Sequence, residues 1–382
     1  NFVPSPKTLL GSINTIPPVI GREDITREMV VSEVLKYLKN DCDSRNIKLE
    51  KKLNLDEAVF TIPVSFNGKA REELRQAAKI AGIEVCYFIH EPLAALYGYI
   101  RQQDDYQRVL QTYHGKYVLV FDWGGGTLDL TLCQIIGGTF HQIKSEGNVD
   151  VGGDKFDEIL ESLVIEKYGI SNNVNAVRRK IDHDVSIKLM QACETAKIAL
   201  SDEEEADIYI RNFLNISDIE DKSLDVVITK EEFENASSQL VQKGIYLIEK
   251  ILDVSGIKRE EVALCLPTGG MINIPMIKNQ LEEMFPGRVD YADYGDRIIS
   301  EGAAWAAHDK VVPVLSKPVE LKLASKDKDN DNNFIVLAPN GKPLPIRDKS
   351  LPIHHSQFYV TDTSDGLVNL QFQCPIGIGR QG

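Results

Sequence analysis

The chain has 382 residues, of which 43% are hydrophobic and 26% are charged. This balance is typical of folded globular proteins and excludes an intrinsically disordered chain, and the length allows two or three domains. The formal net charge is −14. An acidic surface repels phosphate backbones, so we expect no nucleic-acid partner, although backbone N–H groups and a metal ion can still hold a single nucleotide locally.

The six cysteines are scattered along the chain, and none forms a C-x-x-C pair. Several lie in apolar runs such as TLCQII and ALCLP, where a free thiol behaves as a small core residue. This usage favours a reducing compartment, so we expect a cytoplasmic protein. No apolar run reaches about 18 residues, so we expect no membrane span.

The first third of the chain alternates helical and strand patterns. MVVSEVLKYL predicts a helix that ends near residue 40, followed by a charged segment to residue 57. AVFTIPV (58–64) predicts a strand, and KAREELRQAAKIAGI (69–83) predicts a helix. VCYFIHEPLAALYGYI predicts a short strand and then a helix with Pro92 at its first position.

From Lys116 the apolar residues repeat with period two, which is typical of strands. KYVLVFD and TLDLTLCQII predict two strands joined by WGGG, with Leu128, Leu130 and Leu132 on one face, and TFHQIKSEG predicts a third strand. Helical patterns follow in DKFDEILESLVIEKY, SIKLMQACETAKIAL and EEFENASSQLVQKGIYLIEKILDVSG. VALCLPTGG predicts a buried strand, and IPMIKNQLEEMF and DRIISEGAAWAAH predict two more helices.

The composition changes near residue 311. The proline-marked VVPVLSKPVE predicts a linker, and the polar SKDKDNDNN predicts a loop. FIVLAPNGKPLPI and HSQFYVTDTSDGLVNLQFQC alternate and turn like antiparallel β structure. The predicted organisation is therefore a main domain at 1–310, a linker at 311–320 and a β module at 321–382.

VLVFDWGGGTLDL combines a strand, a turn of three glycines and a second strand. Glycines let the backbone approach a ligand and adopt positive φ, and successive N–H groups of such a turn can bind phosphate. Asp122 and Asp129 flank the turn and could hold the water shell of Mg²⁺, and Thr127 adds a hydroxyl. The alternative is a glycine-rich hairpin with solvated aspartates. No Walker motif is present.

Three further features favour the phosphate-binding interpretation, although each has a simpler alternative. Glu91, at a strand-to-helix junction, could activate a water molecule or could merely favour the helix dipole. The pair Gly269–Gly270 could admit a flat ligand or form an ordinary tight turn. Glu194, Lys197 and Ser201 share one helix face, which could contact a ligand or could be a solvated face with one ion pair.

Together these segments resemble the DnaK-type, seventy-kilodalton heat-shock chaperone family, in the same order over roughly residues 5 to 310. FDWGGGTLDL resembles its second phosphate loop, IHEPLAALYGY its catalytic-glutamate segment and VDVGGDKFDEIL its glycine-pair motif. CETAKIALS and LPTGGMINIPMI resemble its adenosine-contacting segments, and DRIISEGAAWAA its closing helix. FTIPVSFNGKAREELRQAAKIAGIEV fits the segment before the glutamate, and KSLPIHHSQFYVTDTSDGLVNLQFQC resembles the start of its peptide-binding β-sandwich.

The resemblance implies an α/β, actin-like (ribonuclease H-like) fold, in which two lobes with five-stranded sheets close over Mg-ATP before a partial β-sandwich begins. It implies that Glu91, Asp122, Thr127 and Asp129 are catalytic. It also implies that Asp122 and Asp129 bind Mg²⁺, and that K⁺ is a further ion at the site. The residues implied to contact ATP or ADP are Gly124, Gly125, Gly126, Thr127, Gly152, Gly153, Glu194, Lys197, Ser201, Gly269, Gly270, Asn273 and Asp296.

The implied function is an ATP-dependent chaperone that couples hydrolysis to the capture of unfolded or extended client peptides. J-domain proteins and nucleotide-exchange factors are the implied co-chaperones. The alternative left open is a weakly hydrolytic or non-hydrolytic nucleotide-binding regulator or scaffold. A sugar or acetate kinase is disfavoured because no acceptor-binding insert is found.

The chain departs from the family pattern at several positions. Ile198 and Asn273 stand where the family has two arginines that sandwich adenine, and Met271 replaces a small hydroxyl residue. Trp123 replaces a small aliphatic residue, and the linker lacks an acidic, leucine-rich stretch. Only one Asp-x-Gly hairpin occurs, whereas this duplicated fold has two, so the first phosphate loop and a catalytic lysine would precede Asn1. We therefore expect this chain alone to hydrolyse ATP weakly or not at all.

Overall fold

The computed structural model describes residues 6–12, 25–49, 55–168, 181–213, 223–292, 294–295, 297–315, 317–322, 334–343 and 371–373. The chain divides into two compact units. The first unit comprises Asn1–Ile62, Asn67–Ile89 and Ala303–Gly382, and the second comprises Pro63–Phe66 and His90–Gly302. The predicted domain borders at 310 and 320 remain a prediction.

The first unit contains helices and strands from both ends of the chain. In the N-terminal part these are η1 (Pro6–Leu9), α1 (Arg27–Leu49), β1 (Glu57–Ile62), α2 (Gly68–Ile80) and β2 (Glu84–His90). Strands β1 and β2 pair with each other, and both the strand predicted at 58–64 and the helix predicted at 69–83 are confirmed. Apolar side chains from β1, α1 and α2 pack together in a small core around Ala78 and Val85.

Helix α1 is longer than the sequence pattern predicted. It continues through the charged residues after position 40 and ends at Leu49. Ion pairs one helical turn apart, Glu33–Lys36 at 2.6 Å and Asp41–Arg45 at 2.8 Å, add to the apolar contacts of Leu35. Apolar periodicity alone therefore placed its end too early.

Three short strands follow near the C-terminus: β9 (Val319–Lys322), β10 (Phe334–Ala338) and β11 (Gln371–Gln373). They form an antiparallel sheet in the order β10-β9-β11. The predicted antiparallel structure is confirmed for these strands. The rest of the segment that resembles a β-sandwich lies outside the described residues.

The second unit is built on a sheet of four described strands in the order β5-β4-β3-β8. The strands are β3 (Tyr117–Trp123), β4 (Leu128–Ile136), β5 (Thr139–Asn148) and β8 (Val262–Thr268). Strand β3 is antiparallel to β4 and parallel to β8. Next to β8, an isolated parallel bridge joins Cys265 to Val289.

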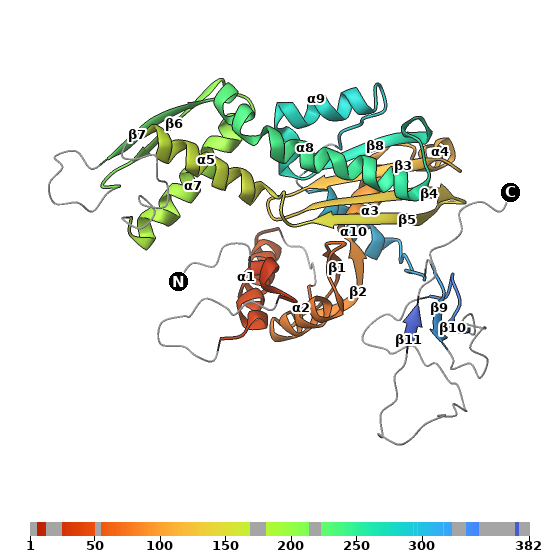
Figure 1. Ribbon diagram of the computed structural model, residues 1–382. Helices are drawn as coiled ribbons and strands as arrows, with labels where there is room; N and C mark the ends of the chain where they lie inside the picture. The colour runs from red at the N-terminus through yellow and green to blue at the C-terminus, as the bar shows by residue number, and fades with distance from the viewer. Residues whose placement is uncertain are drawn as a thin grey trace, which may run out of the picture. The chain divides into compact units, whose positions relative to one another are not determined.

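Both faces of this sheet are covered by helices, because its central strands are apolar on both sides (Figure 1). Val118 and Val120 face helix α3 on one side. Leu128, Leu130 and Leu132 share the other face, as predicted, and pack beneath α8. The helices of this unit are α3 (Glu91–Gln102), α4 (Tyr106–Thr112), α5 (Gly153–Lys167), α7 (His183–Ala199), α8 (Lys230–Ser255) and α9 (Pro275–Met284), with η2 (Arg259–Glu261) and η3 (Gly270–Asn273). Helix α10 (Ile298–His308) begins in this unit, and its residues from Ala303 onward belong to the first unit.

Helix α4 and a second hairpin escaped the sequence analysis. The hairpin joins β6 (Glu205–Ile210) to β7 (Leu224–Thr229), antiparallel, with alternate residues buried.

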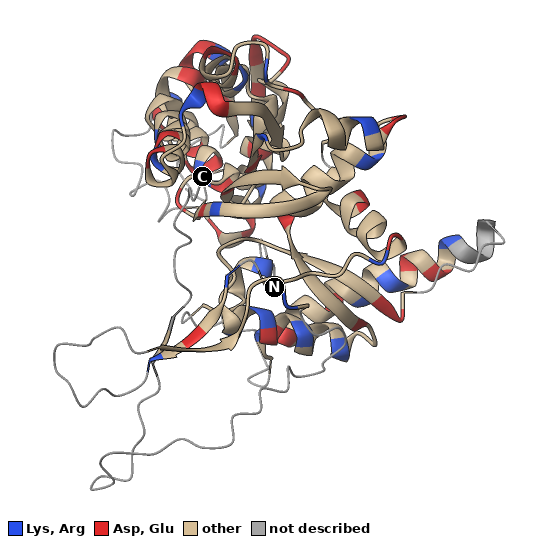
Figure 2. Ribbon diagram, turned by 90° about the vertical axis from the view of Figure 1, so that its right-hand side faces the viewer, with Lys and Arg blue, Asp and Glu red and all other residues tan. Residues whose placement is uncertain are grey.

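Charged residues lie mainly on helices and loops, and the central strands are largely uncharged (Figure 2). The α/β class is thus confirmed. Among the described helices, none is both long and apolar enough to cross a membrane.

Candidate functional site

Two glycine turns leave the sheet of the second unit at the same edge. Strands β3 and β8 run parallel, and Asp122 at the end of β3 lies opposite Thr268 at the end of β8. Gly269 follows with φ +87°, and a Cβ there would lie 2.4 Å from the Trp123 carbonyl oxygen and 2.9 Å from Asp122 Oδ1. Only glycine fits this position, so the glycine pair sits directly against the start of the hairpin.

The hairpin between β3 and β4 brings two carboxylates together. Asp122 and Asp129 are cross-strand neighbours, and both are nearly buried, at 6% and 1% exposure. The Thr127 hydroxyl donates to Asp129 Oδ2 at 2.8 Å, and the Gly124 N–H donates to the Thr127 carbonyl at 2.9 Å. The alternative of a hairpin with solvated aspartates is therefore wrong, because both side chains are buried within the sheet.

The hairpin glycines do not adopt the positive φ that the sequence suggested. Their small size serves close packing of two chain segments instead. The N–H groups of Gly153 and Asp154 donate to the carbonyls of Gly124 (3.0 Å) and Gly125 (2.7 Å). A Cβ on Gly152 would lie 2.4 Å from the Gly126 carbonyl carbon. The first turn of α5 is therefore docked on the hairpin.

Lys197 is turned inward rather than toward solvent. Its Nζ donates to Asp157 Oδ2 at 2.8 Å and to the Gly153 carbonyl at 3.3 Å, and both side chains are about nine-tenths buried. Burial raises the pKa of the Asp157 carboxyl, and the Lys197 ammonium partly offsets this. Glu194 is exposed and Ser201 half-buried, so the predicted shared face does not provide one environment. The one ion pair that the alternative allowed does exist, but it is buried, and it joins Lys197 to Asp157.

Glu91 is the first residue of α3 and is 8% exposed, so Pro92 takes the second helical position rather than the first. Beside it, His90 Nδ1 lies 3.2 Å from Gln142 Oε1. The Gln142 amide donates to Ser145 Oγ at 2.7 Å, and Ser145 Oγ lies 2.9 Å from Thr131 Oγ1. Sequence reasoning missed this polar chain, because it depends on strand register and joins residues far apart.

Residues 14–316 match the family model described as Hsp70 protein. This span is most of the chain, and it contains every candidate residue named above. The chain belongs to the Hsp70 family.

Curated relatives support this membership. The chain is 29% identical over 291 residues to chaperone protein dnaK of Phaeodactylum tricornutum, with 75% of this chain and 44% of the relative covered. The values are 27% over 284 residues for Trieres chinensis (74% and 43%) and 29% over 346 residues for Cyanophora paradoxa (91% and 52%), both also chaperone protein dnaK. This Hsp70-family chain spans about half the length of these relatives.

The residues implied to surround the glycine pair in this Hsp70-family chain differ in how far they are buried. A Cβ on Gly270 would meet open space. Met271 is buried, and its Sδ would lie 2.8 Å from a Cβ on Gly153. Asn273 and Ile198 are exposed, the latter at 62%. Asp296 lies outside the described residues.

The oxygen atoms of the hairpin suit a hard cation in this family member. Mg²⁺ commonly keeps several waters and is held by one or two carboxylates together with substrate phosphates. Asp122 and Asp129 supply such a pair, and Thr127 adds a third oxygen beside them. Across the described ranges, no group of three or more His, Cys, Asp or Glu side chains is arranged to hold a metal ion. The donor set therefore fits Mg²⁺ bound together with a phosphate ligand.

Two surface pockets of the second unit involve other residues. One, of about 500 Å³, lies between α5 and α8, and another, of about 570 Å³, surrounds the end of α8 near Gly256. None of the candidate residues lines either pocket. The argument for a site at the glycine turns therefore comes from backbone geometry and buried carboxylates.

Proposed function

We propose that this chain binds Mg-ATP at the shared edge of β3 and β8, as the nucleotide-binding part of an ATP-dependent chaperone. The observation that carries the proposal is the contact of Gly269 with Asp122 and the Trp123 carbonyl. Because the two glycine turns are adjacent, one nucleotide can reach both. The hairpin would hold the phosphates, and the Gly269–Gly270 turn would hold the adenosine.

At the phosphate end, N–H groups of Gly125 and Gly126 would donate to phosphate oxygens. Asp122 and Asp129, with the Thr127 hydroxyl, would hold the hydrated Mg²⁺, with K⁺ as a further ion. When bound, Mg²⁺ would neutralise charge on the phosphates. The buried Glu91 carboxylate would orient and activate the attacking water.

At the adenosine end, the proposed contacts are Glu194, Ser201, Asn273 and Asp296 around the glycine pair. Lys197 is already bonded to Asp157 and to the Gly153 carbonyl, so we propose that it first of all fixes α7 against α5. Ile198 and Asn273 offer no guanidinium to stack on adenine. We therefore propose a more weakly held base than in members with two arginines.

Three wider points belong to the same proposal. The fold would be actin-like and two-lobed, with nucleotide state passed through residues 311–320 to a peptide-binding β module. Unfolded or extended peptides would be the clients, with J-domain and nucleotide-exchange partners, in the cytoplasm. Support comes from family membership and from relatives that are named chaperone proteins.

A single-turnover ATPase assay on the full-length protein tests the enzymatic part, with Mg-ADP binding measured in parallel. Glu91→Gln should lower the rate by about a hundredfold or more, because a general base is lost, with ADP affinity retained. Glu84→Gln, the same change at an exposed strand start, is the matched control. Equal rates for wild type and Glu91→Gln would refute the assigned role. ADP binding without wild-type turnover would support the non-hydrolytic regulator instead.

A further inference from the structure

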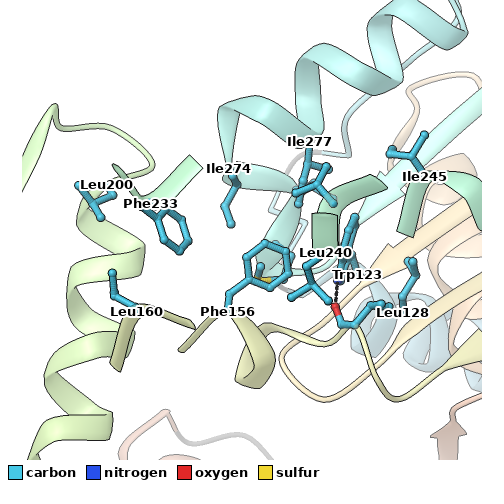
Figure 3. Packing of buried hydrophobic residues seen from close by; sticks show 14 of the residues in the cluster. Trp123, Leu128, Phe156, Leu160, Leu200, Phe233, Leu240, Ile245, Ile274 and Ile277 are labelled. Carbon is cyan, nitrogen blue, oxygen red and sulfur yellow. Dashed lines mark hydrogen bonds between the residues drawn. The ribbon is translucent and has the colours of Figure 1, made fainter. Parts of the chain in front are cut away.

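Trp123 is enclosed on all sides by elements that border the glycine turns. It is fully buried, and its ring lies edge-on to Phe121 at 5.6 Å and to Phe156 at 5.8 Å. Figure 3 shows the Trp123 and Phe156 side chains within the core. It follows Asp122 directly and faces Leu128 across the hairpin. The Trp123 side chain therefore packs where it can hold the hairpin in place.

The indole N–H makes one short hydrogen bond, to the Val151 carbonyl at 2.6 Å (Figure 3). Val151 is 1% exposed and immediately precedes Gly152 and Gly153, whose backbone packs on the hairpin. A buried carbonyl that loses its donor costs free energy, so this bond fixes where the 151–153 segment runs. A smaller aliphatic side chain at position 123 could not make it.

Helix α8 is shaped to accept the same ring. A Cβ on Gly244 would lie 2.3 Å from Trp123 Cη2 and 2.7 Å from Cζ3. Glycine in a helix interior is unfavourable compared with alanine. Its presence in the middle of the 26-residue helix is therefore explained by the indole that fills the space.

The backbone of Trp123 completes the arrangement. Its carbonyl is the group that a Cβ on Gly269 would strike. One residue thus contacts the glycine pair through its main chain, and α8 and the 151–153 segment through its ring. Any shift of α8 would press on the residue next to Asp122.

We infer that Trp123 is a positioning residue that fixes the phosphate-binding hairpin by tying it to Val151 and α8, and that its indole responds to phosphate occupancy. This inference rests on the proposed function. It identifies the residue that supports the phosphate end of that site. The indole ring bonds to Val151 and fills the space at Gly244, whereas it is the main chain of Trp123 that borders Gly269. Loss of the indole should therefore affect phosphate recognition selectively, whereas a merely structural role would affect all ligands alike.

The test compares Mg-ADP and adenosine binding to the full-length protein by calorimetry. Trp123→Phe keeps an aromatic ring and removes the N–H donor, so ADP affinity should fall about three- to tenfold, the effect of one lost hydrogen bond, with adenosine affinity unchanged. Trp305→Phe, on helix α10, is the matched control and should change neither. Equal losses for both ligands, or no loss for either, would overturn the inference.

A second measurement uses the Trp123 indole itself as the reporter. In the Trp305→Phe protein, Mg-ADP should alter the fluorescence of the indole at 123 and adenosine should not, and Trp123→Phe in this background should abolish the signal. An equal response to both ligands, or no response to ADP that binds, contradicts the inference alone. If the wild type binds neither ligand, the proposed function has failed, and the inference falls with it.

Discussion

Burial changes the chemistry of single side chains in this protein. The three thiols in the sheet and helix cores, Cys133, Cys193 and Cys265, are fully buried, whereas Cys42 and Cys86 are partly exposed. Burial raises the pKa of the Cys133 and Cys193 thiols to about 12, and raises the pKa of the Cys265 thiol as well. The reactive thiolate is therefore suppressed at all three positions.

Alkylation of the native protein at about pH 8, read by peptide mass spectrometry, should modify Cys42 and Cys86 and spare the three buried thiols. After unfolding in urea the three buried thiols should react as well, which serves as the control. Rapid native modification of Cys133 would contradict the sheet packing described above.

The Lys197–Asp157 pair makes a second prediction at this scale. Lys197→Met leaves a buried carboxylate without its cation and should cost about 3–5 kcal/mol of unfolding free energy at neutral pH. Because the folded pKa of Asp157 is already raised and rises further without Lys197, its charged form opposes folding above that pKa. The loss should therefore shrink as the pH falls toward about 5.

Urea unfolding of wild type, Lys197→Met and Lys197→Met/Asp157→Leu at both pH values measures this effect. The double variant removes both charges and should recover most of the stability, since well-packed apolar replacements of buried pairs are often neutral. A single variant as stable as wild type at neutral pH would show that the pair contributes little.

At the scale of elements, helix α8 combines a strong start with an unusual middle. Thr229 and Glu232 form a capping box at its first turn, and Gly256 ends it in the left-handed conformation. Between them, Gly244 admits the Trp123 ring. The helix is thus defined locally at its ends and by tertiary packing at its centre.

Gly244→Ala should destabilise the protein by about 1–3 kcal/mol, because overpacking against the indole outweighs the gain in helix propensity. Gly68→Ala, at the start of α2, is the matched control, since a Cβ there meets nothing within 4 Å. It should be neutral or slightly stabilising in the same urea titration. A gain in stability for Gly244→Ala would contradict the fit between α8 and the ring.

The polar chain His90–Gln142–Ser145–Thr131 links the start of α3 to strands β5 and β4. Gln142→Leu breaks two of its links and should let Glu91 shift, which should lower kcat for ATP about tenfold with KM changed less than about twofold. Steady-state kinetics on the full-length protein measure this, with Gln134→Leu, on β4, as the control. An unchanged kcat would show that these hydrogen-bonded side chains have only a structural role.

For the whole molecule, regular patterns could be predicted and long-range contacts could not. The strands from Tyr117 to Asn148 lie in short apolar or alternating segments separated by glycine turns, and they were predicted nearly to the residue. The inward turn of Lys197 escaped prediction because Asp157 lies on another helix, 40 residues away. The β6–β7 hairpin escaped because its short strands carry acidic residues at their exposed positions.

The same distinction between local patterns and long-range contacts applies to the candidate site. The glycine motifs and the carboxylates were visible as spacing, because each lies within one short segment. Their docking on Gly152–Gly153, and the support from Trp123 and Gly244, depend on strand register and helix packing that a single sequence does not contain. The sequence therefore indicated candidate residues for the site but not the contacts that hold them in place.

A crystal structure of the full-length protein grown with Mg-ADP tests the central claim most directly. We predict density for the diphosphate against Gly125, Gly126 and Thr127, the metal ion beside Asp122 and Asp129, and the adenosine along Gly269–Gly270. Nucleotide density on a different surface, or none at saturating ADP, would contradict the account.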